Sequence, residues 1–259
     1  MSARLRFTAT GPTRVALAVN VVQPPAQEQL RIVDGGRVVE DVTEVRDEHG
    51  TRLKLFTTEG GAIEVDYTAR VLGRVEPDEV TALEELYYVR PSRYCESDLL
   101  TFQAGADFAG LVGADAVNAV ASWVGERLRY VPGASGPADG ALATLQSREG
   151  VCRDYAHVVV ALLRALHIPA RVAAVYAPGL SPMDFHAVAE AAIDGQWRVV
   201  DATGLAPRES LLRIATGRDA ADISFLDTSG PDIVLDELVV TAVVDTLPVD
   251  DPPRLVSLG

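Results

Sequence analysis

Cys152, His186 and Asp201 are the residues of this sequence whose types could perform nucleophilic chemistry together. A cysteine thiolate attacks carbonyl carbons, a histidine takes or shares the thiol proton, and an aspartate fixes the imidazole tautomer and stabilises its cationic form. Cys152 begins an apolar stretch that predicts a buried helix over residues 152–168. The positive end of that helix favours the thiolate and supplies backbone N–H donors to a developing oxyanion. This combination is typical of covalent acyl transfer.

A short turn is expected to bring the histidine and the aspartate together. The Asp-Gly pair at 194–195 is a strong signal for a two-residue β-hairpin loop. If Ile193 pairs with Gln196 across this loop, His186 and Asp201 become diagonal neighbours on one face of the hairpin. Their backbones would then lie roughly 7 Å apart, within reach of the two side chains. Because a register shift of one residue would separate them, the prediction depends on this turn.

Three other roles compete for Cys152, namely core packing, a disulfide with Cys95 and metal binding. A disulfide is disfavoured because the sequence has no export signal, which indicates a reducing compartment. A metal site is disfavoured because His157 lies five positions away, whereas side chains three or four apart share a helix face. Packing is the usual role of a cysteine in an apolar helix, but the hairpin geometry favours the nucleophile. Cys95 is expected to be packed, and Asp154 and His157 to have supporting roles. Tyr130, just before the Pro-Gly loop, is a candidate for the wall of the cleft but is not counted among the site residues.

Two segments resemble a known family, namely GVCRDYAHVVVALLRALHIPARVAAVY and DFHAVAEAAIDGQWRVVDAT. They are similar to the transglutaminase-like superfamily, in its bacterial branch of transglutaminase-like cysteine proteases, and the resemblance covers about residues 115–217. In that family a cysteine opens a helix, a histidine lies on a following strand, and an aspartate lies in a D-x-T motif on the next strand. The resemblance therefore implies the catalytic residues Cys152, His186 and Asp201, with Thr203 completing the motif.

The resemblance implies an α+β fold, in which a papain-like cysteine-protease or transglutaminase core follows an N-terminal antiparallel β-sandwich. The strand patterns predict a β-rich domain at 1–92 and a catalytic domain at 93–259 with a C-terminal β extension. The Pro- and Asp-rich last dozen residues are expected to be mobile. One departure from the family is Val188, where an aromatic residue is common. The helices predicted within the catalytic domain cover 115–130, a short piece at 141–150, and 152–168. The predicted strands cover 170–177, 184–193, 196–203, 211–217 and 233–244.

The composition limits the partners of the protein. The formal net charge of −14 disfavours nucleic acid and anionic membranes, because both require a basic surface, and it mildly favours cationic or neutral substrates. No run of about 18 apolar residues predicts a transmembrane helix, and the N-terminus lacks the apolar region of a secretory signal, so a cytoplasmic location is expected. The sequence has neither a phosphate-binding glycine pattern nor an acidic loop with calcium-site spacing. We therefore expect no cofactor and no metal.

The residues and the resemblance together predict an enzyme with a Cys-His-Asp triad that cleaves peptide or amide bonds through a thioacyl intermediate. Its partner would be a peptide or protein amide substrate. Transamidation is a first alternative, because it shares the initial half-reaction with hydrolysis and differs only in the acceptor of the acyl group. A second alternative is a binding module that keeps the fold without catalysis, and the complete set of three residues argues against it.

Overall fold

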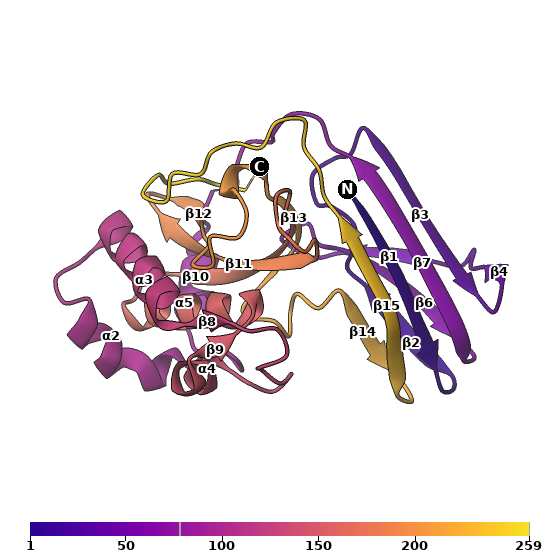
Figure 1. Ribbon diagram of the computed structural model, residues 1–259, viewed down its shortest axis with the longest axis horizontal. Coiled ribbons are helices and arrows are strands. Elements are labelled where there is room, and N and C mark those ends of the chain that lie inside the picture. The colour runs from indigo at the N-terminus through magenta and orange to yellow at the C-terminus, as the bar shows by residue number, and fades with distance from the viewer. Residues whose placement is uncertain (78, 259) are drawn as a thin grey trace.

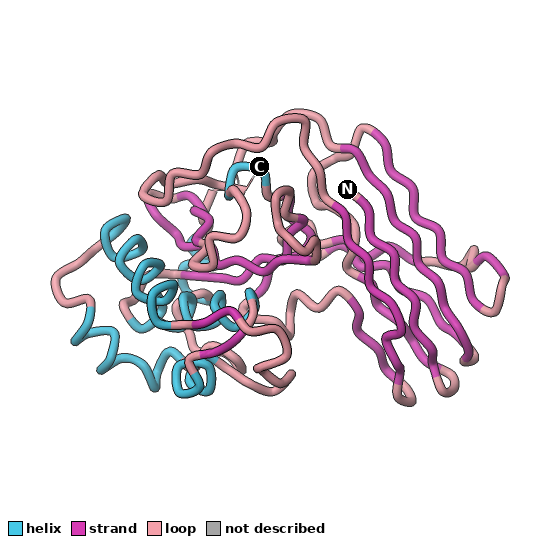
Figure 2. Tube along the Cα trace, in the orientation of Figure 1, coloured by secondary structure: helices cyan, strands magenta, loops and turns pink. Residues whose placement is uncertain are grey.

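The computed structural model describes residues 1–77 and 79–258, which form two regions side by side (Figure 1). Within these residues, one region is a sandwich of two antiparallel sheets, and the other combines a further antiparallel sheet with helices. Figure 2 shows the helices gathered at one end of the molecule and the sandwich strands at the other. The predicted α+β class is confirmed by this arrangement.

The sandwich forms because its strands alternate between buried apolar and exposed polar side chains. In β1 (Ser2–Ala9), Leu5 and Phe7 are fully buried, whereas Arg4 faces solvent and pairs with Asp66 at 2.9 Å. One sheet has the order β15-β1-β7-β3-β4, with β15 (Ile233–Thr241), β7 (Gly61–Arg70), β3 (Gln27–Asp34) and β4 (Arg37–Val38). The other has the order β14-β2-β6-β5, with β14 (Leu226–Ser229), β2 (Thr13–Leu17), β6 (Arg52–Thr58) and β5 (Thr43–Arg46).

Two strands from the end of the chain complete the sandwich. β15 pairs with β1 and β14 pairs with β2, so each sheet receives one strand from the C-terminal part. The C-terminal β extension predicted with the catalytic domain is thus paired with the N-terminal strands, while the boundary at residue 92 stays a prediction. The physical reason is that β15 supplies an apolar partner for β1, since Leu238 lies opposite Leu5. Strand patterns indicate where strands lie but not with which strands they pair.

The other region is built around an antiparallel sheet with a buried helix against it. Every residue of β10 is buried, so its sequence is a continuous apolar run with one arginine. The sheet has the order β12-β11-β10-β13, with β12 (Gln196–Val200), β11 (Phe185–Ile193), β10 (Ala170–Tyr176) and β13 (Leu212–Gly217). The helices are α1 (Ala82–Tyr87), α2 (Thr101–Asp107), α3 (Gly113–Arg127), α4 (Ala141–Ser147) and α5 (Cys152–Ala165), with 3₁₀ turns at Ser97–Leu100 and Arg208–Ser210. A short parallel pair joins β8 (Arg129–Tyr130) and β9 (Glu149–Gly150).

Helix α5 packs against β10 and β11 and is buried from Asp154 to Ala165. It was predicted to reach residue 168 but ends at Ala165, because His167 adopts a left-handed backbone conformation with a φ of 60°. The Ile168 N–H then bonds the Leu163 carbonyl at 2.9 Å and satisfies one of the last helical carbonyls. Within the described part of the chain, no helix is both long and apolar enough to cross a bilayer.

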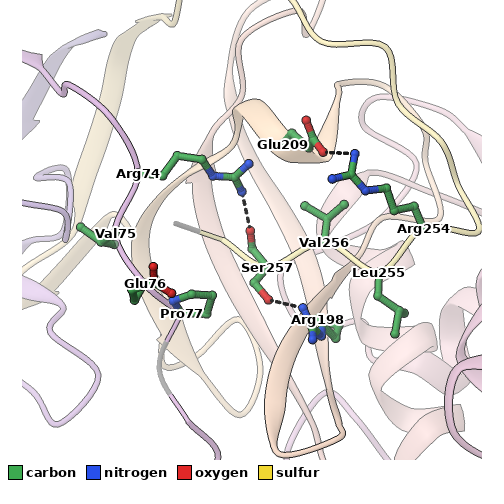
Figure 3. A pocket seen from close by; sticks show the side chains of 10 residues that line it. All are labelled: Arg74, Val75, Glu76, Pro77, Arg198, Glu209, Arg254, Leu255, Val256 and Ser257. Carbon is green, nitrogen blue, oxygen red and sulfur yellow. Dashed lines mark hydrogen bonds and ion pairs between the residues drawn. The ribbon is translucent and has the colours of Figure 1, made fainter.

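The last residues of the chain pack onto the second region. Arg74 and Arg198 both donate hydrogen bonds to Ser257, at 2.9 Å and 3.1 Å (Figure 3). Val256 and Leu258 on either side are buried, with exposures of 5% and 4%. The expectation of a mobile C-terminal segment is therefore wrong for these residues. Local composition suggested mobility, whereas the sheet offers a small apolar core that accepts both side chains.

A buried charge cluster joins the sheet of the second region to α1. Glu190 on β11 is fully buried between Arg171 and Arg213, whose guanidinium nitrogens lie 2.9 Å and 2.6 Å from its carboxylate. Arg171 also pairs with Glu84 of α1 at 2.7 Å and lies over the ring of Trp197. Burial by itself raises the pKa of Glu190, but the two arginines outweigh this effect and hold the pKa well below its usual range.

We expect Glu190→Gln to destabilise the fold by about 3–5 kcal/mol, because it removes the buried negative charge that Arg171 and Arg213 share. The free energy of unfolding from urea titrations measures this loss. Because the folded pKa is lowered, the contribution of Glu190 is complete above its unfolded value of 4.5 and is lost as the pH falls toward the folded pKa. Asp66→Asn, which removes the exposed pair with Arg4, is the control and should change the free energy little. Equal losses in the two variants would contradict the prediction.

Candidate active site

Cys152 is the first residue of α5 and borders a cavity with a volume of about 680 Å³. The residue is partly buried, whereas the rest of the helix from Asp154 onward is buried. The thiol is therefore at the point where the buried helix meets the cavity. The start of a helix offers N–H groups without intrahelical partners and the positive end of the helix dipole, and both favour a thiolate.

Asp154 holds the start of α5 in place. Its buried carboxylate accepts hydrogen bonds from the Val151 N–H at 2.8 Å and from the Ser135 hydroxyl at 2.5 Å, and it pairs with Arg153 at 2.9 Å. Gly150 permits this approach, since a Cβ there would lie 2.7 Å from the Asp154 Cβ. Asp154 thus fastens a distant loop to the residue before the cysteine. The sequence predicted only a supporting role for Asp154, although the glycine four positions earlier was an available signal.

The side chains of His186 on β11 and Asp201 directly after β12 meet as predicted. The His186 Nε2 lies 2.8 Å from the Asp201 Oδ2, and the two side chains are 0% and 2% exposed. The predicted hairpin register is confirmed, because Ile193 pairs with Gln196. The structure therefore brings together the histidine and the aspartate that the sequence placed on one face.

Thr203 binds the other oxygen of the Asp201 carboxylate. Its backbone N–H and its hydroxyl lie 2.8 Å and 2.7 Å from Asp201 Oδ1. This local turn replaces the strand ladder, so β12 ends at Val200 and not at residue 203 as predicted. The D-x-T spacing therefore has a structural purpose, which is to give the two carboxylate oxygens different partners. The threonine occupies one carboxylate oxygen and leaves the other for the histidine.

The surroundings of His186 favour its cationic form. Burial by itself lowers the pKa of His186, but the hydrogen bond and the charge of Asp201 outweigh this effect and raise the pKa well above 6.5, with a further contribution from Cys152. Burial likewise raises the pKa of Asp201, and the bond with His186 more than reverses this and holds the pKa below its usual range. Because Nε2 is bound to Asp201, the buried Nδ1 is the ring nitrogen left for the thiol.

Tyr130, which the sequence analysis did not count among the site residues, lies next to Cys152. It lies on β8 opposite Gly150 of β9, and its ring packs on Tyr155 with 6.1 Å between the centroids. Tyr130 is close enough to Cys152 to interact with it electrostatically, and burial together with this neighbour raises the pKa of Tyr130 to about 12. The tyrosine therefore stays protonated and able to donate a hydrogen bond. No local pattern could have revealed this contact, because it depends on the pairing of β8 with β9.

His157 and Cys95 are packed residues. The His157 Nε2 accepts a hydrogen bond from the Ala220 N–H at 3.1 Å, and its ring stacks on Tyr94. Burial lowers the pKa of His157 to about 4, so its ring is neutral. Cys95 is fully buried, and burial raises its pKa to about 12. Over residues 1–77 and 79–258, no three histidine, cysteine, aspartate or glutamate side chains gather as ligands for a metal ion.

Proteins similar to this chain match most of its length. Residues 107–202 match the model of the transglutaminase-like superfamily core. A crystal structure of a candidate cysteine protease from Cytophaga hutchinsonii is 30% identical, with a TM-score of 0.79, and the match covers 97% of this chain and 93% of that chain. An uncharacterised protein of Mycobacterium leprae is 25% identical over 236 residues, which cover 85% of this chain and 82% of the relative. The chain belongs to the transglutaminase-like superfamily.

In this transglutaminase-like protein, the predicted core and N-terminal sandwich are both confirmed, because the similarity to the Cytophaga structure extends over both regions. Val188, where the family often has an aromatic residue, is 1% exposed and lies in a small second core with Ala173 and Val199. It is not among the described residues that border the cavity. The departure from the family pattern therefore affects the packing of the core and not the wall of the cavity.

We expect Asp201→Asn to lower the pKa of His186, because the substitution removes the charge that outweighs burial. The titration of the His186 ring proton by NMR measures the effect. Since the folded pKa of the wild type is raised, the stability from this pair is complete below the unfolded value of 6.5 and is lost as the pH rises through the folded pKa. Asp227→Asn removes another carboxylate at the cavity and should leave the titration unchanged. An identical His186 titration in the wild type and in Asp201→Asn would refute the pairing.

Proposed function

We propose that the protein is a thiol-dependent acyl-transfer enzyme that cleaves peptide or amide bonds with Cys152, His186 and Asp201. The observation that most supports this proposal is that a thiol at a helix N-terminus and a buried histidine paired with an aspartate border one cavity. Membership of the superfamily supports a cysteine protease-like or transglutaminase-like activity in general. The specific reaction is inferred from the side chains of this chain.

In the first half-reaction, the Cys152 thiolate attacks the carbonyl carbon of the scissile amide and a C–S bond forms. Negative charge moves to the carbonyl oxygen, where the first N–H groups of α5 and the Tyr130 hydroxyl donate hydrogen bonds. As the C–N bond breaks, the His186 imidazolium gives its Nδ1 proton to the leaving amine. A thioester on Cys152 and a free amine result.

In the second half-reaction, water attacks the thioester carbon while the neutral His186 takes a proton from it. The C–S bond breaks, the carboxylic acid is released, and the thiolate and the imidazolium are restored. Asp201 keeps its negative charge throughout, because its role is to orient the ring and to stabilise its cation. Thr203 maintains that orientation by occupying Asp201 Oδ1.

Transamidation and a non-catalytic binding role are the alternatives. A primary amine in place of water would convert the same thioester into a new amide. We favour hydrolysis because the Cytophaga relative is described as a candidate cysteine protease. We disfavour a purely binding role because all three side chains of the proposed triad are present, and Cys152 and His186 border the same cavity.

We expect Cys152→Ala to abolish turnover of peptide amides and His186→Ala to lower it about a thousandfold or more, because nucleophile and base act as a unit. Turnover is measured on a mixed library of fluorogenic peptide amides, and mass spectrometry identifies the acyl product with and without an added primary amine. A free acid indicates hydrolysis, and a new amide indicates transamidation. Cys95→Ala removes the other cysteine and should retain both turnover and iodoacetamide labelling. Turnover that persists in Cys152→Ala would disprove the proposal.

We expect Tyr130→Phe to lower kcat by about 10- to 100-fold with little change in KM, because the hydroxyl contributes when the oxyanion forms. Steady-state kinetics on the best substrate of the library measures both constants. Tyr155→Phe changes the neighbouring ring in the same way and should keep the wild-type kcat. An unchanged or higher kcat in Tyr130→Phe would show that the hydroxyl does not stabilise the oxyanion.

A further inference from the structure

The cavity at the thiol lies between the two regions of the molecule. Cys152 and His186 border it from the region of the helices, whereas Asp227 of β14 and Leu238 of β15 border it from the sandwich. In Figure 1, β14 and β15 are the sandwich strands that face the helices. The sandwich therefore supplies part of the wall of the cavity that contains the thiol.

A crossing segment, defined here as residues 218–225, forms another wall of this cavity. It connects β13 to β14, and it is attached to both regions. The Ala220 N–H donates to the His157 Nε2 at 3.1 Å, and the Phe225 carbonyl accepts from the Ala18 N–H at 3.0 Å. A wall that is fixed at both ends is already in place before a ligand binds, so little ordering is needed on binding.

Part of the wall of this cavity is apolar. Phe225 of the crossing segment packs on Phe185 with 5.3 Å between the ring centroids, and Phe185 directly precedes His186. Ile223 and Leu238 border the same space. Phe185, Phe225 and Leu238 are each only partly buried. They therefore retain apolar surface that a ligand side chain can cover, with a gain that grows with the area removed from water.

The charged groups of the cavity disfavour an acidic ligand. Asp184 and Asp227 both border the cavity. Arg153 also borders it, but its guanidinium pairs with the buried Asp154. Carboxylates in a partly enclosed site repel a further negative charge. A neutral apolar side chain meets no such penalty.

We propose that this cavity is the acyl-donor subsite and that it selects a peptide with a large apolar side chain beside the scissile amide, received between Phe225 and Leu238. The inference rests on the proposed thiol chemistry and adds the class of substrate. The occupant is the substrate because the apolar walls and Cys152 border one continuous cavity of about 680 Å³, a volume suited to a few residues of peptide. The sandwich thereby takes part in substrate selection.

Peptidyl acyloxymethyl ketones that differ only in the residue beside the ketone test this inference. The thiolate displaces the carboxylate of the probe, so that a C–S bond forms while a C–O bond breaks, and no turnover is needed. The second-order rate of labelling at Cys152 is measured by mass spectrometry. We expect probes with Phe and Leu to label at least about tenfold faster than the probe with Gly, and the probe with Asp to be slowest.

Variants of Leu238 test the contribution of the sandwich. Leu238→Ala should lower the ratio of the Phe rate to the Gly rate by about fivefold, because the Phe side chain then covers less apolar surface. Leu238→Trp should slow the Phe probe selectively, because the added ring fills the cavity. Val239→Ala and Val239→Trp are the matched controls, since Val239 follows Leu238 on β15 but is 46% exposed and does not border the cavity.

The outcomes separate the inference from the proposed function. Equal labelling by the Phe, Leu and Gly probes, or ratios that the Leu238 variants leave unchanged, would overturn the inference while labelling at Cys152 still supports the thiol chemistry. A lack of labelling by every probe would overturn both. If circular dichroism shows that Leu238→Ala does not fold, Phe225→Ala takes its place with the same expected ratio.

Discussion

The burial of helix α5 is the constraint on which the rest of the structure depends. The helix is packed against β10 and β11 and enclosed from Asp154 onward, yet its first residue must meet the cavity. The first N–H groups of a helix have no acceptors within the helix. Asp154 supplies one for the Val151 N–H and at the same time ties down the loop of Ser135. The hydrogen bonds needed at this helix start therefore explain why polar residues surround the first turn of an otherwise apolar helix.

Two buried histidines, one on α5 and one on β11, show how hydrogen-bond partners determine whether a buried imidazole carries a charge. His157 and His186 are both almost fully buried, and burial lowers the pKa of each. The His157 ring nitrogen accepts a backbone hydrogen bond from Ala220, which suits the neutral form. His186 instead meets the carboxylate of Asp201, which reverses the effect of burial and favours the cation. One histidine therefore holds a wall of the cavity in its neutral form, while the other is paired with a carboxylate that favours its cation.

The cavity exists because the chain leaves the sandwich and returns to it. The crossing segment and the strands β14 and β15 come after the elements that hold the three proposed catalytic residues, and they pair with strands from the beginning of the chain. One apolar core runs through both regions and includes residues as distant as Leu5 and Leu163. The two regions are thus packed against each other, and strands of the sandwich border the same cavity as the thiol.

The sequence by itself determined the helix start at Cys152, the register of the hairpin, and the meeting of His186 with Asp201. These features depend on local periodicity and on an Asp-Gly turn, whose geometry is set by the backbone of a few residues. The predicted ends of strands and helices were less accurate. Strand β12, for example, ends at Val200, because the hydrogen bonds of Thr203 to Asp201 replace further strand pairing. Only the tertiary structure decided the contact of Tyr130 with the cysteine, because it depends on a two-residue strand pair.

The tertiary structure also decided the membership of β14 and β15 in the sandwich and the apolar wall that reaches Leu238. Each of these features joins residues that are far apart in the chain. Their spacing leaves no periodic signal, because a strand pattern shows which face is apolar but not which strand will cover it. Two short segments therefore suffice to predict the proposed chemistry, whereas the shape of the cavity beside Cys152 depends on packing the two ends of the chain together.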